Sequence, residues 1–273
     1  MKKIFTIRPL VKYEIGMASS LIPIEWNCDF EAFQHLHLGD GNYEAFGGFL
    51  NDQFIGIGDL IINGNTGWLG NIVVNPEFRT HGYGQEMTMF LVNYLKKHGC
   101  KSIFTMAIES SQSLYQKLGF LTSSIYCVLH GNLLNAPILI KEIRPIELKD
   151  LDQIYSLDAI ATGEDRSKLF NNFALKGFVY ISRYSQEIQG FYLSGTGEGP
   201  IIASSSEAGL ALLHLKHSLS LQDAAIPCEN GTAVEYLKKN HFHETALIYR
   251  MSLGEDLDWK PEMMFSRASR YCA

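Results

Sequence analysis

A stretch of the chain at residues 73–85, VVNPEFRTHGYGQ, combines residue types that could bind a phosphate group. A strand-like run ends at a proline, a short loop follows, and two glycines open a long amphipathic segment. The first amides of a helix have no hydrogen-bond partner within it, and the helix dipole adds partial positive charge beside them. A phosphate is stabilised at such a position. Glycine at positions 82 and 84 would let its oxygens reach the backbone, because a Cβ there would hold them away.

Two common phosphate-binding motifs do not fit this stretch. A dinucleotide fingerprint requires a third glycine where Met87 stands, and a P-loop requires a Gly-Lys-Ser/Thr sequence that does not follow. Gly-x-Gly also occurs at ordinary loop-to-helix junctions, where it serves turn geometry alone. The spacing is therefore compatible with a phosphate-binding loop of another kind. The alternative is that the glycines have a purely structural role.

The elements that must position this loop follow the order β-α-β-β-β-α-β-α-β. Strands are expected over residues 4–8, 43–50, 54–62, 68–74, 102–108 and 121–129, and helices over 11–21, 83–98 and 110–118. The helix over 83–98 has the clearest pattern, with apolar residues at helical spacing and Gly99 at its end. Asn51-Asp52 between two apolar runs predicts a hairpin. The order predicts an α/β domain with a mixed sheet rather than a doubly wound one.

The second half of the chain repeats landmarks of the first. Residues 143–145, Ile-Arg-Pro, echo residues 7–9, and an aliphatic residue and a helical segment follow each. Residues 230–242, NGTAVEYLKKNHF, echo residues 110–120, SSQSLYQKLGF. Two matched landmarks in the same order indicate an internal repeat of about 130 residues, longer than any solenoid period.

Length and composition fit two folded domains. At the usual size of about 100–200 residues per domain, a chain of 273 residues is long enough for two. Residues 132–137 contain turn formers and a proline, so we take them as the linker between a domain over 1–132 and a second over 138–273. Hydrophobic residues make up 46% of the chain and charged residues 19%, which excludes intrinsic disorder as the main state.

Charge and cysteine content exclude several classes of function. A net charge of −6 and a pI near 5.8 provide no basic surface for a nucleic acid. The N-terminus lacks the apolar core of a signal peptide, and no apolar run approaches the ~18 residues of a membrane span, so we expect a cytoplasmic protein without a membrane partner. The five cysteines are far apart and never form a CxxC pair. We therefore expect reduced thiols, no disulfide framework and no metal site.

Two motifs in the first half together resemble the GNAT acyltransferase superfamily. One is Val-x-Pro-x-x-Arg-x-x-Gly-x-Gly in the loop, and the other is Leu-Tyr-x-Lys-Leu-Gly-Phe at residues 114–120, a helix and a strand later. The resemblance covers roughly residues 4–130 and implies acetyl-CoA as cofactor. It also implies a mostly antiparallel sheet with splayed strands flanked by helices. The cofactor-binding residues it implies are Ile72, Val73, Val74, Arg79, Thr80, His81, Gly82, Tyr83, Gly84, Gln85 and Ser111.

A narrower resemblance, to bacterial tandem-GNAT proteins of the YitH-like kind, extends over the second half. Its motifs lie at residues 25–27 (Glu-Trp-Asn), 163–167 (Gly-Glu-Asp-Arg-Ser) and 199–203 (Gly-Pro-Ile-Ile-Ala). It implies two tandem GNAT-like domains. The second is degenerate, because residues 204–208 read Ser-Ser-Ser-Glu-Ala where a phosphate loop should stand. Glu207 would repel a pyrophosphate and the glycine pair is missing, so we predict that the second half does not hold acetyl-CoA.

Candidate catalytic residues follow from what acyl transfer needs. The resemblance places Tyr115 beside the coenzyme sulfur, where a phenol can protonate the leaving thiolate; packing on the sheet is its alternative role. A backbone N–H at Val74 could bind the thioester oxygen. Some relatives carry a glutamate base on the strand before this point, but residues 68–71 read Trp-Leu-Gly-Asn. Asn71 could order a water that carries the proton away, and the alternatives on the substrate side are Glu25, Asp59, His35 and His37.

The sequence thus predicts an N-acetyltransferase that acts on a primary amine of an unidentified acceptor. The first half would catalyse and the second half would cover or shape the acceptor site. Trp26, Asn27 and Tyr43 are candidates for the acceptor pocket, with core packing as the alternative for the aromatic rings. An acyl-CoA-binding sensor without turnover is the second hypothesis, since the carboxylate base is missing. A monomer and a homodimer are both open.

Overall fold

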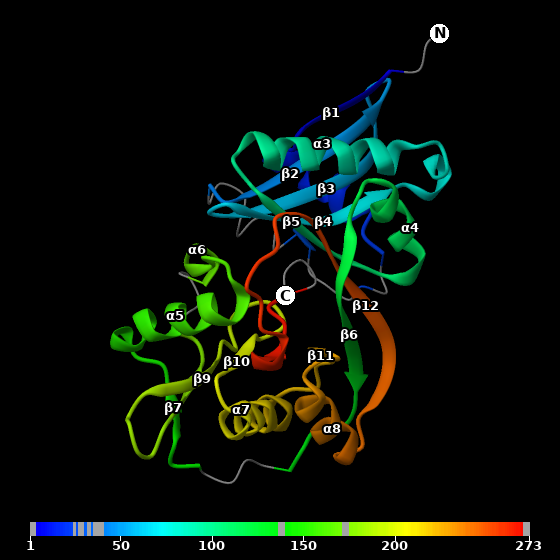
Figure 1. The fold of residues 1–273 in the computed structure, drawn as a ribbon. Coiled ribbons are helices and arrows are strands. Elements are labelled where there is room, and N and C mark those ends of the chain that lie inside the picture. The colour runs from blue at the N-terminus through cyan, green and yellow to red at the C-terminus, as the bar shows by residue number, and fades with distance from the viewer. Residues whose placement is uncertain are drawn as a thin grey trace. The chain divides into compact units, whose positions relative to one another are not determined.

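The computed structural model describes residues 4–23, 26, 30–31, 34, 41–135, 140–170 and 175–269 (Figure 1). The chain forms two compact units, residues 1–105 and 106–273, and each is described by itself. None of the described helices is long and apolar enough to cross a membrane.

Unit 1 is built on strands of a mixed sheet, which follow one another in the order β1-β2-β3-β4-β5. The strands are β1 (Phe5–Pro9), β2 (Tyr43–Leu50), β3 (Gln53–Asn63), β4 (Thr66–Val74) and β5 (Ser102–Ala107). Neighbours among β1 to β4 pair antiparallel, and β4 and β5 pair parallel. The predicted hairpin between β2 and β3 turns at Asn51 (φ 47°) and Asp52 (φ 66°), the left-handed pair of a two-residue hairpin loop. The sheet is mixed, as the order of elements predicts.

The helices of unit 1 are η1 (Lys12–Glu14), α1 (Ile15–Ser19), η3 (Pro76–Phe78) and α3 (Tyr83–Lys97). Helix α3 lies across β3 and β4 because glycines on those strands let it approach (Figure 1). A Cβ on Gly58 would come within 2.8 Å of Leu91 Cδ1, and one on Gly67 within 2.6 Å of Leu95 Cδ2. This close packing fixes where the first turn of α3 lies relative to the end of β4.

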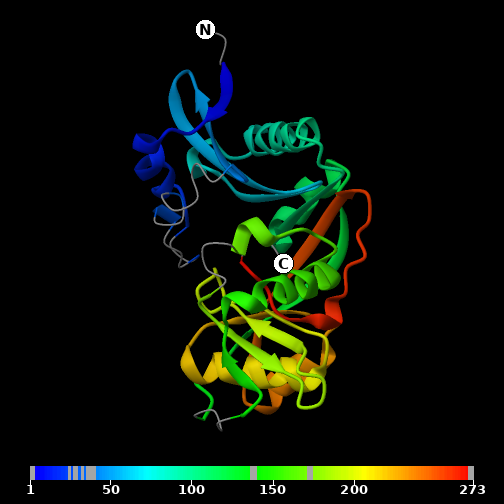
Figure 2. The same cartoon turned by 90° about the vertical axis from the view of Figure 1, so that its left-hand side faces the viewer.

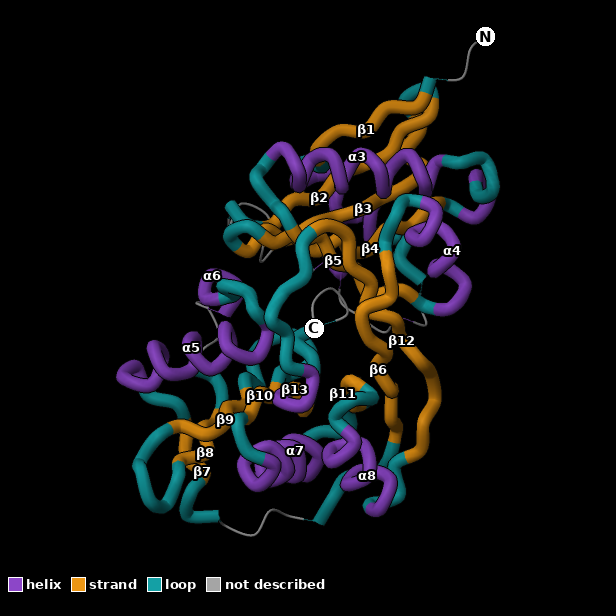
Figure 3. Tube along the Cα trace, viewed as in Figure 1, coloured by secondary structure: helices purple, strands orange, loops and turns teal. Residues whose placement is uncertain are grey.

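Unit 2 contains α4 (Glu109–Lys117), a long antiparallel ribbon and a second sheet. In the ribbon, β6 (Leu121–His130) pairs with β12 (His243–Gly254) on one side and β11 (Ala224–Pro227) on the other, as the paired strands in Figure 3 show. The last strand of the first sequence repeat is therefore built into a sheet with strands of the second. This explains why the compact units divide within β5, whereas the repeat predicts a domain boundary near residues 132–138.

The second sheet of unit 2 is antiparallel, in the order β13-β10-β9-β8-β7. Its strands are β7 (Ile143–Pro145), β8 (Phe178–Ile181), β9 (Ile188–Tyr192), β10 (Ile201–Ala203) and β13 (Met264–Ser266). The helices of the unit are η4 (Leu148–Asp150), α5 (Leu151–Thr162), α6 (Ser167–Phe170), α7 (Ser206–Leu219), α8 (Gly231–Lys239) and η5 (Pro261–Met263). Helix α7 runs along β8, β9 and β10 (Figure 2). Its Leu212 and Leu213 belong to the core of the unit.

The internal repeat is visible in a bidentate arginine–carboxylate ion pair that occurs in both units. Arg8 binds both carboxylate oxygens of Glu14, six residues on, at 2.9 and 2.6 Å. Arg144 binds both carboxylate oxygens of Asp150, again six residues on, at 2.6 and 2.8 Å. In each unit the carboxylate also accepts the backbone N–H three residues before it, which starts the 3-10 turn. The Ile-Arg-Pro landmarks therefore mark equivalent structural positions.

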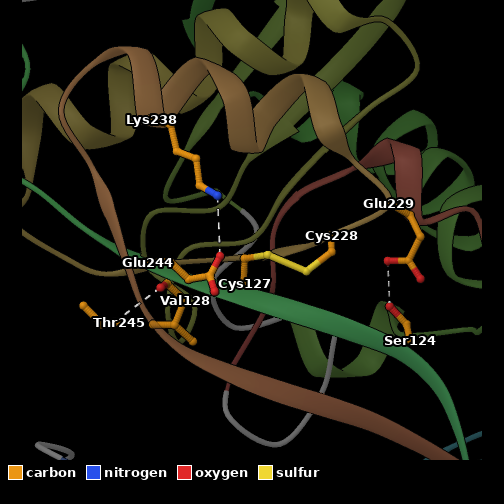
Figure 4. The surroundings of a disulfide bond; sticks show 8 residues. All are labelled: Ser124, Cys127, Val128, Cys228, Glu229, Lys238, Glu244 and Thr245. Carbon is orange, nitrogen blue, oxygen red and sulfur yellow. Dashed lines mark hydrogen bonds and ion pairs between the residues drawn. A yellow bond between two sulfur atoms is a disulfide. The ribbon is translucent and has the colours of Figure 1, made fainter.

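The expectation that the described cysteines are all reduced is wrong. Cys127 on β6 and Cys228, just after β11, form a disulfide with Cα atoms 5.7 Å apart (Figure 4). They are 101 residues apart in sequence, and only the pairing of β11 with β6, Ile226 opposite Cys127, brings them together. Cys100 is a buried free thiol whose pKa is raised by burial. The other two cysteines lie outside the described residues.

Candidate functional site

The end of β4 carries a bulge and separates from β5. Ile57 pairs with Val73 and Asp59 with Gly70, so Asn71 and Ile72 together lie opposite one residue of β3. Asn71 adopts a left-handed backbone conformation, with φ 43°. The described ladder between β4 and β5 ends at Leu69 and Thr105. Beyond this point, β4 is paired along β3 alone, which opens the splay that the family resemblance implies.

The backbone of Val74 points into this opening. The amide of Asn75 donates to Ile55 O at 2.8 Å, which makes Gly56 and Val74 a non-hydrogen-bonded pair of the antiparallel ladder. The N–H and C=O of Val74 are therefore directed away from β3. Its carbonyl accepts a hydrogen bond from Arg79 Nε at 3.0 Å, which draws the loop back against the strand end. The N–H lies on the same side and can serve an incoming carbonyl.

The loop after β4 leaves the start of α3 uncovered. Gly82, with φ 91°, is the N-cap, and the first helical bond runs from Glu86 N to Gly82 O at 3.0 Å. Among the described residues, no acceptor binds the amides of Tyr83, Gly84 and Gln85. The side chains of Thr80 and His81 both turn back to the carbonyl of Arg79, at 2.6 and 2.8 Å. The first turn of α3 can therefore accept an anion from solvent.

The two glycines of the loop differ in why they lack a side chain. The positive φ of Gly82 strains any other residue. Gly84 has an ordinary helical conformation, and within the described part of the chain a Cβ there would meet only Val74 Cγ2, at 3.7 Å. Packing within the protein therefore leaves room for a side chain at 84. A ligand at the amides would explain why the position is bare.

A buried polar cluster lies on β3 beside the bulge. The Asp59 carboxylate is fully buried, and its Oδ2 accepts from Tyr43 OH at 2.8 Å and from Asn71 Nδ2 at 2.9 Å. Gln34 Nε2 lies 3.5 Å from the same oxygen and also donates to Tyr43 OH. Two of the predicted site residues, Tyr43 and Asn71, thus both donate a hydrogen bond to Asp59. In the sequence, Asp59 is distinguished only as the one charged residue within the apolar run FIGIGDLII.

The remaining predicted residues are placed as follows. Tyr115, on α4 in unit 2, is 7% exposed and its ring lies 5.6 Å from that of Phe120. Ser111 donates its hydroxyl to Ile108 O at 3.0 Å in the first turn of the same helix. Trp26 is half-buried. Glu25 and Asn27, with His35 and His37, lie outside the described residues.

The matching junction in unit 2, between β10 and α7, has a different chemistry. Ser205 is the N-cap of α7, and its Oγ accepts from the amide of Ala208 at 3.2 Å. Glu207 stands in the first turn, and burial together with this nearby carboxylate raises the pKa of Tyr180 to about 12. Helix α8 is likewise capped by its own Asn230, which accepts from Ala233 N at 3.1 Å. The starts of α7 and α8 are thus each capped by a side chain of the protein.

Comparisons with known proteins agree with this architecture. The acetyltransferase (GNAT) family matches residues 16–120, and an acetyltransferase (GNAT) domain family matches residues 154–266. A Pyrococcus horikoshii protein assigned to the acetyltransferases superposes with a TM-score of 0.83 at 19% identity, over 98% of this chain and 96% of that one. A GCN5-related N-acetyltransferase from Sphaerobacter thermophilus gives 0.64 at 16% identity, over 94% and 98%. No curated protein matches the sequence. At these identities the structural likeness concerns the fold alone.

Proposed function

Because the chain consists of two GNAT acetyltransferase domains, we propose that it transfers an acetyl group from acetyl-CoA to a primary amine, with catalysis in the first half. The observation that carries this proposal is the uncovered first turn of α3 beside the splayed end of β4. The amides of Tyr83, Gly84 and Gln85, which have no acceptor within the described part of the chain, lie close to a strand end whose Val74 N–H points away from β3. Together they fit a long ligand with a diphosphate at one end. The acceptor is a small molecule or peptide that remains to be identified.

The cofactor-binding residues fall into two groups. The amides of the loop and of the first turn of α3 would hold the pyrophosphate, and the backbone of β4 from Ile72 to Val74 would hold the pantetheine arm. Ser111 already donates to Ile108 O, so a hydrogen bond to the backbone at the start of its own helix accounts for its hydroxyl without a coenzyme contact. Acetyl-CoA supplies an activated thioester when bound.

The chain's own groups would then act on that thioester. The neutral amine attacks the carbonyl carbon, and the N–H of Val74 stabilises the negative charge that develops on the oxygen. As the C–S bond breaks, Tyr115 donates its proton to the departing sulfur. The ammonium proton would pass to solvent through a water ordered by Asn71, or to the carboxylate of Glu25. Trp26 and Asn27 are proposed for the acceptor side; Tyr43 is only 3% exposed, and its hydroxyl is bound to Asp59.

A two-part experiment tests the proposal. Calorimetry with acetyl-CoA should give one binding site per chain, and an amine panel should release free CoA thiol in the presence of acetyl-CoA. Tyr115→Phe should lower kcat at least about tenfold while leaving the acetyl-CoA dissociation constant within about threefold. Absence of acetyl-CoA binding would rule the proposal out, and equal losses in binding and kcat would assign Tyr115 a packing role.

A sensor that binds acyl-CoA without turnover is the second candidate function. It is favoured by one observation: the residues of β4 from Trp68 to Asn71, where the bulge begins, contain no carboxylate that could serve as base. Such a protein would bind acetyl-CoA and release no thiol with any amine.

We also propose, from the sequence resemblance, a place in the YitH-like tandem group, a repeat boundary at residues 132–138, a second half that holds no acetyl-CoA, and a cytoplasmic location.

A further inference from the structure

We propose that Asp59 is a positioning residue that keeps the β4 bulge in the shape the thioester site needs, acting through Asn71. The inference rests on the proposed acetyl-CoA site and adds a residue that the family motifs do not contain. It changes the role of Asn71, from ordering a water to holding the backbone.

The first step concerns the backbone at Asn71. A φ of 43° is uncommon for a residue with a side chain, although asparagine tolerates it better than most. This one residue changes which backbone groups face β3 and which face the opening. With the bulge, Val73 pairs with Ile57, and the N–H of Val74 points toward the opening. A regular strand would turn the other set of amides outward.

The second step concerns what holds that conformation. Asn71 Nδ2 donates to Asp59 Oδ2 at 2.9 Å, and a hydrogen bond to a carboxylate is stronger than one to a neutral acceptor. Asp59 lies on β3, opposite Gly70, so the bond spans the bulge itself. The Asn71 amide is thus bound to a neighbouring strand.

The third step concerns what holds Asp59. A fully buried carboxylate is costly unless donors surround it. Tyr43 OH donates from β2 at 2.8 Å, and Gln34, itself fully buried, bridges to both groups. Donors from β2, from β4 and from the segment at residue 34 therefore fix one carboxylate oxygen, which in turn fixes Asn71. The cluster ties the bulge to the rigid centre of the sheet.

Two substitutions at Asn71 separate the roles. Glycine adopts a φ of 43° without a side chain, so Asn71→Gly preserves the bulge, whereas Asn71→Ala keeps neither the hydrogen bond nor an easy backbone. We expect kcat of Asn71→Ala to fall at least about tenfold below that of Asn71→Gly, because only the glycine variant keeps the backbone of the bulge. Asp59→Ala should resemble Asn71→Ala, and Asp59→Asn, which keeps an acceptor, should recover part of the loss. Asn51→Gly, at φ 47° in the β2–β3 turn, is the matched control and should leave kcat unchanged.

A binding readout makes the test independent of turnover. The ratio of the dissociation constants of CoA and acetyl-CoA reports contacts to the acetyl group, while the α3 amides hold the phosphates of both. The wild type should prefer acetyl-CoA, and Asn71→Ala should reduce that preference with little change in CoA affinity. Loss of CoA binding in the wild type would instead defeat the proposed function.

Three results would overturn the positioning role itself. Equal losses of kcat in Asn71→Gly and Asn71→Ala would mean that the amide acts directly on water or substrate. No loss in Asn71→Ala would mean that the bulge needs no anchor, and equal wild-type affinities for CoA and acetyl-CoA would mean that β4 does not contact the acetyl group. If Asp59→Ala does not fold, the Asn71 pair still decides.

Discussion

Helices α3 and α7 occupy equivalent places in the two repeats, but their N-terminal ends differ. Helix α3 begins at a left-handed glycine and leaves three amides without acceptors among the described residues. Helix α7 begins at Ser205, which binds the amide of Ala208, and carries Glu207 in its first turn. The same fold element can therefore present its helix dipole to a ligand or satisfy it with its own side chains, and a few residues make the difference.

The C-terminal ends of these helices differ in the same sense, with α3 open to solvent and α7 enclosed. Lys96 and Lys97 at the end of α3 are exposed, whereas Lys216 and His217 of α7 are buried. Lys216 Nζ binds Glu198 O at 2.5 Å and Ser266 Oγ at 2.7 Å, and burial lowers its pKa to about 8. Burial, with Lys216 adjacent, lowers the pKa of His217 to about 3. Helix α7 is thus part of the interior of unit 2, while α3 is attached to unit 1 by one face.

The largest expected effect, on acetyl-CoA affinity, comes from placing the glutamate of the first turn of α7 at the equivalent position of α3. Gly84 and Glu207 are both the second residue of their helix. Gly84→Glu should weaken acetyl-CoA binding at least about 100-fold, because a negative charge enters the anion site, with little loss of folding stability. Calorimetry measures the affinity and urea unfolding the stability. Glu207→Gly is the control and should change neither affinity nor the stoichiometry of one; unchanged binding in Gly84→Glu would refute the phosphate site.

The second effect concerns the buried end of α7 and depends on pH. As pH falls below 6.5 the unfolded chain protonates His217, but the folded protein does not until about pH 3. Folding stability is therefore lost as pH falls, by about 2–3 kcal/mol between pH 6.5 and 4.5 from this group. Urea unfolding should show that His217→Leu removes this part of the slope. An unaltered slope in His217→Leu would contradict the assignment.

A smaller effect is expected from removing the cap of α7. Ser205→Ala should lower the free energy of unfolding by about 1 kcal/mol, because the amide of Ala208 loses its acceptor. Gly82→Ala should cost a similar amount in unit 1 through strain at positive φ. Only Gly82→Ala should also weaken acetyl-CoA binding. If Ser205→Ala created a second binding site, the capped helix start would be a suppressed cofactor site.

The smallest effect concerns Thr80, which adopts φ 67° in the loop before α3. A β-branched residue is strained in this region, so Thr80→Gly should raise the free energy of unfolding by about 0.5–1 kcal/mol, measured in urea. Because the Thr80 side chain binds the Arg79 carbonyl and not the amides of α3, affinity for acetyl-CoA should stay within about threefold. A loss of stability would show that this bond outweighs the strain.

Local features of this protein were readable from the sequence alone. The apolar spacing of α3, the Asn51-Asp52 hairpin and the glycines of the loop depend on residues a few positions apart, and each is present as predicted. The repeated Ile-Arg-Pro motifs could also be recognised in the sequence. They mark equivalent positions in the structure, where Arg8 and Arg144 each bind a carboxylate six residues further along the chain. Helix and turn preferences act over such distances, so sequence neighbours suffice to express them.

The tertiary structure alone decided which distant residues meet. The disulfide joins cysteines 101 residues apart, and β6 of the first repeat pairs with β11 and β12 of the second. The contact of Asp59 with Tyr43 and Asn71 depends on the register of three strands and on a one-residue bulge. A shift of one residue in any of these pairings would turn the side chains to the other face of the sheet. Pairing and register follow from the packing of the whole chain, so no local pattern of residues specifies them.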